Sequence, residues 1–454
     1  MTTTFTEVMV PVGDLVLGMH IVRLDRPWSE TDFLIQGFVI NDPEVIDALV
    51  MQCDFVYIEG RSTTQLSRSC CSPSERRKDN CGLSSRGTSS SKTDSNSVKK
   101  PNKKSTSARP PQGKNKIVYI NKISTENAIP EAKLAYSSAK KTVQSIMDGI
   151  RLGRMIDMNE ARETVNTIVD DILQNKDALA WLTKIKNKDA YTAEHSLNVS
   201  ILSATFARHL GHSEVDIKKI ALGGLLHDVG KARVPNEILN KEGRFTDEEF
   251  DIMKQHPLFG RNLLISMSKK DHSTIDVAHC HHERIDGNGY PRKLTADQIP
   301  YFAKIVAITD TYDAITSSRC YDKGRASMEA LDIIYKCKGT QFDAELALEF
   351  IKCIGIYPPG AIVELKNGAV GIVIETHENN KLKPRVLLVL DEKKKEQPQE
   401  IVDLNLNVTD GSGQLLQIAH ELTNGAYGVQ LEEYLKRGLL LNNKTQADSH
   451  VVGR

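Results

Sequence analysis

The chain lacks the features of an exported or membrane-spanning protein. Nowhere among its 454 residues do about 18 apolar residues run together, and its start has no basic patch followed by an apolar stretch. Basic and acidic residues are equal in number, 59 each, so no overall field attracts nucleic acid or an anionic membrane. The eight cysteines form no CxxC pair, which is typical of a reducing compartment. We therefore expect a cytoplasmic protein with neither stable membrane insertion nor a specific nucleic-acid partner.

A local scarcity of aliphatic residues divides the chain. Residues 61–116 consist mainly of Ser, Thr, Asn, Lys and Arg, with 14 basic and 3 acidic residues. Such a segment cannot bury enough apolar surface to offset its ordering entropy, so we predict a disordered basic linker. Its charge leaves open a contact with RNA, acidic lipid or an acidic partner, although a solvated spacer is the simpler interpretation.

The residues before the linker, 1–60, are predicted to form a small α+β accessory module. Two β-type runs, a helix-type run and a third β-type run follow one another there. Strands are expected over residues 8–22, 33–40 and 55–58, with a helix over 43–51 that begins after Asn41 or Asp42.

The residues after the linker are predicted to be mainly helical as far as residue 355, because apolar residues recur there at helical spacing. Within residues 117–355, helices are expected over 132–150, 158–174, 177–186 and 192–209. The pattern then changes to β-branched runs separated by turn residues, which predict a small β-subdomain. This subdomain, residues 356–410, is expected to hold a meander over 361–365, 369–376 and 384–390, and residues 411–454 a helix over 431–440 with a loose tail. The fold class is therefore mainly α.

Seven side chains of metal-binding types recur in order along the helical region. Imidazole and carboxylate are costly to bury unless they are hydrogen-bonded or bound to a cation. Seven ligands are too many for one tetrahedral ion, but they suit two octahedral divalent ions that share a bridging Asp, the usual apparatus for splitting a phosphodiester. For any one of these histidines alone, a core residue bonded to a backbone carbonyl would be the favoured interpretation. The whole set favours a metal site. The seven are His195, His227, Asp228, His256, His281, His282 and Asp310.

The expected surroundings of these ligands follow from their neighbours. His227 and Asp228 follow the apolar run 221–226 and are expected on a helix beside the ions. His256 is expected to close a helix that Pro257 stops. Asp310 follows the apolar stretch 305–308, where a buried carboxylate needs a cation.

Two motifs resemble those of a known family. His227-Asp228 with Gly230-Lys231 resembles the motif of the HD hydrolases, and residues 281–291, HHERIDGNGYP, resemble the HHExxDGxGYP signature of the HD-GYP subfamily. The likeness covers roughly residues 130–360. The front module, with Gly18-Met19 and residues 24–28, is similar to an uncharacterised domain common ahead of bacterial HD-GYP units.

The resemblance implies hydrolysis of the bacterial second messenger cyclic di-GMP, to linear pGpG and on to GMP, with two iron or manganese ions. By analogy the seven side chains are the ligands, and Asp228 and a metal-activated hydroxide bridge the ions. Lys231 would contact a phosphate oxygen or, as a weaker option, protonate the leaving ribose oxygen. Arg319 would grip phosphate, with a surface ion pair as an equal alternative. Tyr290 would touch substrate, and its loop is linked in the family to protein partners.

Departures from the family pattern leave alternatives open. Tyr191 stands where members with three metals have a Glu, so two ions are predicted, and Cys320 and Asp322 break the usual pattern around Arg319. The protein could instead hydrolyse another cyclic dinucleotide such as cyclic GMP-AMP, or be a non-hydrolysing sensor or scaffold that acts through the GYP loop. The oligomeric state is open, with a homodimer as one alternative.

Overall fold

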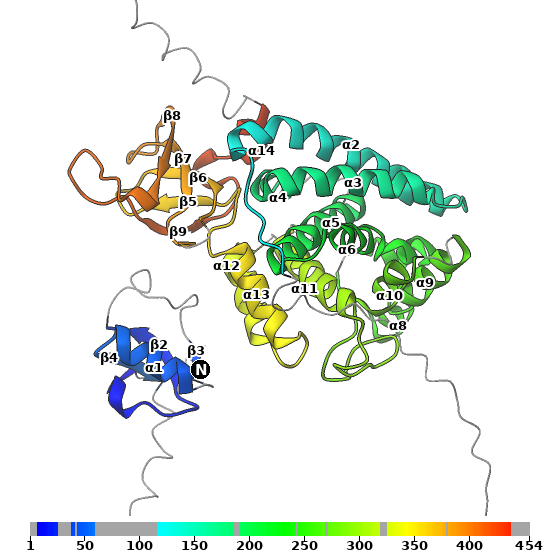
Figure 1. The fold of residues 1–454 in the computed structure, drawn as a ribbon, viewed down its shortest axis with the longest axis horizontal. Coiled ribbons are helices and arrows are strands. Elements are labelled where there is room, and N and C mark those ends of the chain that lie inside the picture. Colours follow the sequence, from blue (N-terminus) through cyan, green and yellow to red (C-terminus); the bar gives the residue numbers. More distant parts are fainter. Residues whose placement is uncertain are drawn as a thin grey trace, which may run out of the picture. The chain divides into compact units, whose positions relative to one another are not determined.

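The computed structural model divides the chain into two compact units, residues 1–106 and residues 107–454 (Figure 1). The predicted linker, apart from Lys116, lies outside the described residues. The described residues are 7–25, 38–40, 43–59, 116–185, 191–241, 243–267, 271–317, 325–377 and 380–436.

The first unit is the predicted α+β module. Its antiparallel sheet has the order β1-β4-β2-β3, and apolar side chains such as Ile21, Val56 and Ile58 are fully buried. The single strand expected over 8–22 is wrong, because a 3-10 turn at Val12–Asp14 and the left-handed backbone of Gly18 (φ 91°) interrupt it. The elements are β1 Glu7–Pro11, β2 His20–Leu24, β3 Phe38–Val39, α1 Pro43–Gln52 and β4 Phe55–Glu59.

The second unit is mainly helical, which confirms the predicted fold class. α3 has the predicted bounds, Met158–Gln174, because Asp157 caps it by accepting hydrogen bonds from two amides of the first turn. α2 begins earlier than expected, at Thr125, since Ala128 and Ile129 are buried and their packing outweighs the hydrogen bond lost at Pro130. The remaining helices are α4 Lys176–Leu182, α5 Tyr191–Leu210, α6 Glu214–Leu226, α7 Asn236–Leu239, α8 Asp247–Met253, α9 His256–Met267, α10 His272–Cys280, α11 Tyr301–Thr316, α12 Ser327–Lys336 and α13 Ala344–Ile354.

A five-stranded antiparallel sheet follows the helices, in the order β8-β7-β6-β5-β9 (Figure 1). The three predicted strands are confirmed as β5 Ile362–Leu365, β6 Val370–Glu375 and β7 Arg385–Leu390. Two edge strands were missed, β8 Glu396–Asp403 and β9 Ile418–Leu422, because edge strands carry polar side chains and, in β8, a proline. The sheet extends past the boundary expected at residue 410, because β9 pairs with β5.

Half-buried polar contacts join the sheet to the helices. Arg385 of β7 forms ion pairs with Glu126 of α2 and Glu375 of β6, and Glu421 of β9 accepts hydrogen bonds from the amides of Ser327 and Met328 at the start of α12. A short helix, α14 Leu431–Lys436, follows β9; the rest of the predicted helix over 431–440 lies outside the described residues. Within the described ranges, no helix combines the length and the apolar composition that a bilayer span requires.

Candidate metal centre

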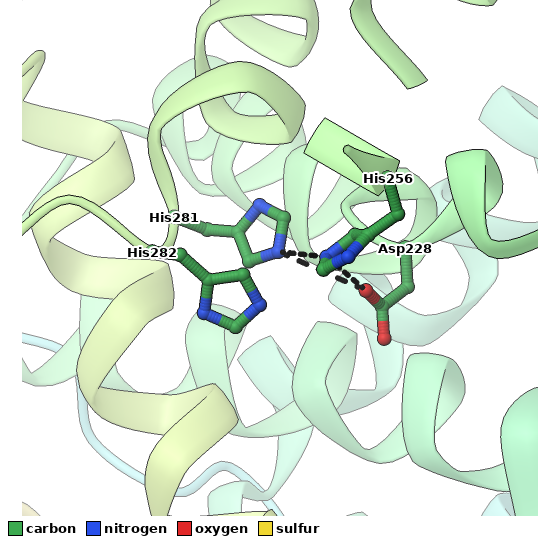
Figure 2. Close-up of side chains that lie close together, drawn as sticks. All are labelled: Asp228, His256, His281 and His282. Atoms are coloured by element: carbon green, nitrogen blue, oxygen red, sulfur yellow. Dashed lines mark hydrogen bonds and ion pairs between the residues drawn. The ribbon is translucent and has the colours of Figure 1, made fainter. Parts of the chain in front are cut away.

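The seven predicted ligands come together in two adjacent groups in the helical part of the second unit. One group is Asp228, His256, His281 and His282, and the other is His195, His227 and Asp310. Within each group the potential ligand atoms lie within 4.8 Å of one another. Figure 2 shows the four side chains of the first group, with dashed lines for the contacts among His281, His256 and Asp228. The elements that supply the seven are α5, the end of α6, the start of α9, the end of α10 and α11.

The adjacent pair His227-Asp228 lies at a helix end and not within a helix, contrary to expectation. α6 stops at Leu226, His227 is its C-cap, and Asp228 has left helical geometry at φ −101° and ψ 7°. Neighbours within a helix point about 100° apart, and this break in the helix removes that divergence. Both side chains therefore reach the same cluster.

His256 opens a helix, so the expectation that it closes one is wrong. It is the first residue of α9, and Pro257 follows within the first turn. Proline is tolerated there because the first amides of a helix have no intrahelical acceptor. The helix start holds His256 almost completely buried against the cluster.

Three of the imidazoles are held by backbone carbonyls. Nδ1 of His227 lies 2.7 Å from the oxygen of Gly224, and Nδ1 of His256 lies 2.7 Å from that of Met253. Nδ1 of His281 lies 3.1 Å from the oxygen of Ala278. A carbonyl only accepts, so each Nδ1 carries a proton and donates it. An imidazole that donates from Nδ1 in this way can present the lone pair of Nε2 to the centre, as a metal ligand requires.

Asp228 faces both groups with different oxygens. Its Oδ2 lies 3.2 Å from Nε2 of His227 and 3.8 Å from Nε2 of His195. Its Oδ1 lies 3.3 Å from Nε2 of His256 and 3.7 Å from Nε2 of His281. This is the arrangement of a carboxylate that can bridge two cations.

The imidazoles His256 and His281 of the first group supply no positive charge. Burial lowers the pKa of His256 to about 3 and that of His281 well below its usual value, so both rings are neutral. Their Nε2 atoms, 3.3 Å apart, then face each other without a proton between them. Nε2 of His227 and Oδ1 of Asp228 are also buried with no hydrogen-bond partner among the described residues. Imidazole and carboxylate donors in this arrangement fit divalent cations.

Two side chains of the second group, His195 and Asp310, form an ion pair with each other. Nε2 of His195 lies 3.1 Å from Oδ1 of Asp310. Burial raises the pKa of Asp310, but the hydrogen bond from His195 and the charges of the nearby histidines outweigh it and hold the pKa well below its usual value. Burial likewise lowers the pKa of His195, yet its hydrogen bonds to Asp310 and Asp313 raise it to about 9. A metal ion would therefore compete with a proton for Nε2 of His195.

Two of the three predicted substrate contacts lie beside the cluster. Lys231 stands on a 3-10 turn, Val229–Arg233, with Nζ 2.5 Å from Oδ2 of Asp228. The ring of Tyr290 stacks on that of His282, with centroids 4.7 Å apart and an interplanar angle of 30°. Arg319 lies outside the described residues.

A pocket of about 400 Å³ adjoins the cluster, and His281 and His282 form part of its wall. Aromatic and cationic side chains line it, among them Phe250, Lys254, Arg284, Tyr290 and Lys293. The ring of Phe250 meets that of Tyr290 edge-on, with centroids 6.3 Å apart. The sequence analysis missed Phe250 and Lys254, although an aromatic and a cation within the six residues before His256 were a usable signal. Aromatic faces and cations suit a nucleobase and a phosphate.

The loop that carries Tyr290 is fixed by Glu283. The Glu283 carboxylate accepts hydrogen bonds from the amides of Arg292 (2.7 Å) and Leu294 (2.8 Å). A Cβ at Gly289 would lie 2.5 Å from Cα of Glu283, so the turn admits only glycine. The loop therefore holds Tyr290 against the cluster.

Comparisons with known proteins agree with this arrangement. The sequence matches the HD domain over residues 168–346, a domain of unknown function, DUF3391, over residues 7–161, and a KOW domain associated with HD domains over residues 362–409. A cyclic di-GMP phosphodiesterase of Pseudomonas aeruginosa is 39% identical over 284 residues, which are 62% of this chain and 68% of that protein. The chain belongs to the HD-GYP family.

Other HD-GYP relatives are matched over a smaller share of their length. A cyclic di-GMP phosphodiesterase of Thermotoga maritima is 38% identical over 36% of this chain and 45% of its own length. A 3′3′-cGAMP-specific phosphodiesterase of Vibrio cholerae is 32% identical over 38% of this chain and 37% of its own length. Among solved structures, an HDG"Y"P protein from Bdellovibrio bacteriovorus aligns over 76% of this chain and 98% of its own, at 16% identity and a TM-score of 0.43.

Proposed function

We propose that this HD-GYP protein is a metal-dependent phosphodiesterase that hydrolyses cyclic di-GMP to pGpG, GMP or both. The observation that carries the proposal is the clustering of five histidines with Asp228 and Asp310, beside a pocket lined by aromatic and cationic side chains. The names of the similar proteins from Pseudomonas aeruginosa and Thermotoga maritima support the substrate. We also propose that the protein acts in the cytoplasm.

The proposed cofactor is a pair of iron or manganese ions. His195, His227 and Asp310 would hold one ion, His256, His281 and His282 the other, and Asp228 would offer one oxygen to each. Bound in this way, two divalent ions lower the pKa of a coordinated water and screen the charge of a phosphate. Members of the family with three metals have a Glu at the position of Tyr191, so two ions are proposed here and not three.

Lys231 and Tyr290 would act on the substrate directly. The Lys231 ammonium lies at the edge of the centre, so it can donate to a phosphate oxygen once Asp228 binds cations, or protonate the leaving ribose oxygen as a weaker option. Tyr290 offers its ring to a base, and Arg319 is the proposed second phosphate contact. We further propose that the GYP loop binds a protein partner, as the family resemblance implies. A homodimer is proposed as the oligomeric state.

The test is turnover of cyclic di-GMP by protein purified without oxygen and loaded with Fe²⁺ or Mn²⁺. Wild type should form pGpG or GMP, and His227→Ala and Asp228→Ala should lose all turnover while their circular dichroism is unchanged. His209→Ala is the matched control, since His209 lies on α5 and pairs with Glu349, away from the cluster. Equal turnover in wild type and both site variants would reject the assignment.

Cyclic GMP-AMP is the second candidate substrate. The similarity to a 3′3′-cGAMP-specific enzyme of Vibrio cholerae favours it. Parallel measurement of kcat/KM on both cyclic dinucleotides decides between them. Tight binding of either one without product, with metal present, would instead identify a sensor or scaffold.

A further inference from the structure

His195 is held differently from the other histidines whose Nδ1 contacts are described. Nδ1 of His227, His256 and His281 faces a backbone carbonyl, whereas Nδ1 of His195 lies 2.8 Å from the carboxylate oxygen Oδ2 of Asp313. Asp313 stands on α11, three residues after Asp310, and only 1% of its surface is exposed.

Asp313 is surrounded by groups that donate to it. Nδ2 of Asn198 lies 3.3 Å from Oδ1, and the hydroxyl of Ser317 lies 3.1 Å from Oδ2. The amide of Asn198 is oriented in turn by Tyr136 of α2, whose hydroxyl donates to Oδ1 of Asn198 at 3.0 Å. An ionised carboxylate only accepts, so His195 must donate its Nδ1 proton to Asp313. Nε2 of His195 is then the atom that reaches Asp310, at 3.1 Å.

We propose that Asp313 is a positioning residue of the metal centre, which orients His195 and raises its basicity toward the ion held with His227 and Asp310. A carboxylate on the far nitrogen of an imidazole fixes its orientation and strengthens it as a ligand. The inference rests on the proposed function. It makes the two metal positions unequal, because among the ligand contacts that the structure describes, a side-chain carboxylate outside the ligand set holds His195 alone.

The test is the binding of Mn²⁺. Equilibrium dialysis with metal analysis measures how many ions bind and how tightly, and electron paramagnetic resonance shows whether two ions are coupled. Wild type should bind two ions and show the spectrum of a coupled pair. Asp313→Asn should bind one ion as wild type does and the other about 10–100-fold more weakly, with an uncoupled spectrum. His195→Ala should behave in the same way. Asp171→Asn, which changes a half-buried carboxylate on α3 outside the ligand set, should keep both ions.

A second variant keeps the test decisive if Asp313→Asn does not fold. Asn198→Ala leaves His195 and Asp313 in place but removes one donor, and should weaken the same ion several-fold. Unchanged affinity for both ions, or equal weakening of both, in the folded variants overturns the inference. Wild-type protein that binds no Mn²⁺ would instead overturn the proposed function, so the two failures are distinguishable.

Discussion

Replacing Gly230 with alanine should move His256 and disable the centre. Gly230 lies on the turn after Asp228, and the start of α9 packs directly on its backbone. A Cβ there would lie 1.9 Å from the carbonyl oxygen of His256 and 2.4 Å from the amide nitrogen of Gly260. Both are backbone atoms, so no side-chain rotation relieves the clash, and α9 must move.

The size of the effect follows from that distance. Ordinary contact with a Cβ begins at 3.4 Å, so the His256 carbonyl must move by about 1.5 Å. Misplacing a reacting group by about 1 Å costs about 100-fold in rate, and overpacking of this kind costs about 1–3 kcal/mol of stability. Gly230→Ala should therefore lose at least about 100-fold in kcat, bind Mn²⁺ more weakly and melt at a lower temperature.

The matched control is Gly149→Ala. Gly149 lies inside α2, where a Cβ would meet nothing closer than 3.9 Å, and alanine in a helix is favoured over glycine by up to about 1 kcal/mol. This variant should keep its metal and activity and melt at the same or a higher temperature. If Gly230→Ala retained both ions and turned over cyclic di-GMP within twofold of wild type, the packing argument would be wrong.

Three further predictions concern pH, substrate and metal. Burial, aided by the charges of Glu131 and Asp170, raises the pKa of Asp171 to about 6, so the contribution of this carboxyl to stability should fall as pH rises from about 4 to 6. The free energy of unfolding of Asp171→Asn should thus exceed that of wild type by about 1 kcal/mol at pH 7.5 and equal it at pH 4. Urea unfolding at both pH values measures this difference, and the same difference at both would contradict the prediction. Phe250→Ala should raise KM at least severalfold with little loss of kcat, whereas a loss confined to kcat would place Phe250 outside substrate binding. Chelation of the metals should remove about 2.7 kcal/mol of stability for an ion present at 100 times its dissociation constant, and an unchanged melting temperature would exclude tight metal binding.

Much of the fold was predictable because its signals are local. The bounds of α3 follow from the Asp157 cap and the helical spacing of Val165, Ile168 and Val169, all of which are buried. β6 and β7 are apolar enough to be found in the same way. β8 and β9 were not predictable. They pair with β7 and β5 through backbone hydrogen bonds, and their polar sequences lack the apolar pattern that indicates a strand.

The candidate site shows the same division. The identity of the seven potential ligands was evident from residue type and order, since each side chain can bind metal wherever it lies in the chain. Which atoms face one another could not be inferred, because it depends on where helices end: at His227 a helix closes, and at His256 one opens. The contact of Asp313 with His195 spans 118 positions and likewise had no local signal.

The helix ends at the centre also shape its electric field. α6 and α10 finish at His227 and His281, so the negative ends of two peptide dipoles point at the place where cations would bind. α9 begins at His256, so its positive end points to the same place and would attract an anion such as phosphate. A chain with no net charge can in this way attract ions of both signs to one location, using its main chain and not its surface residues.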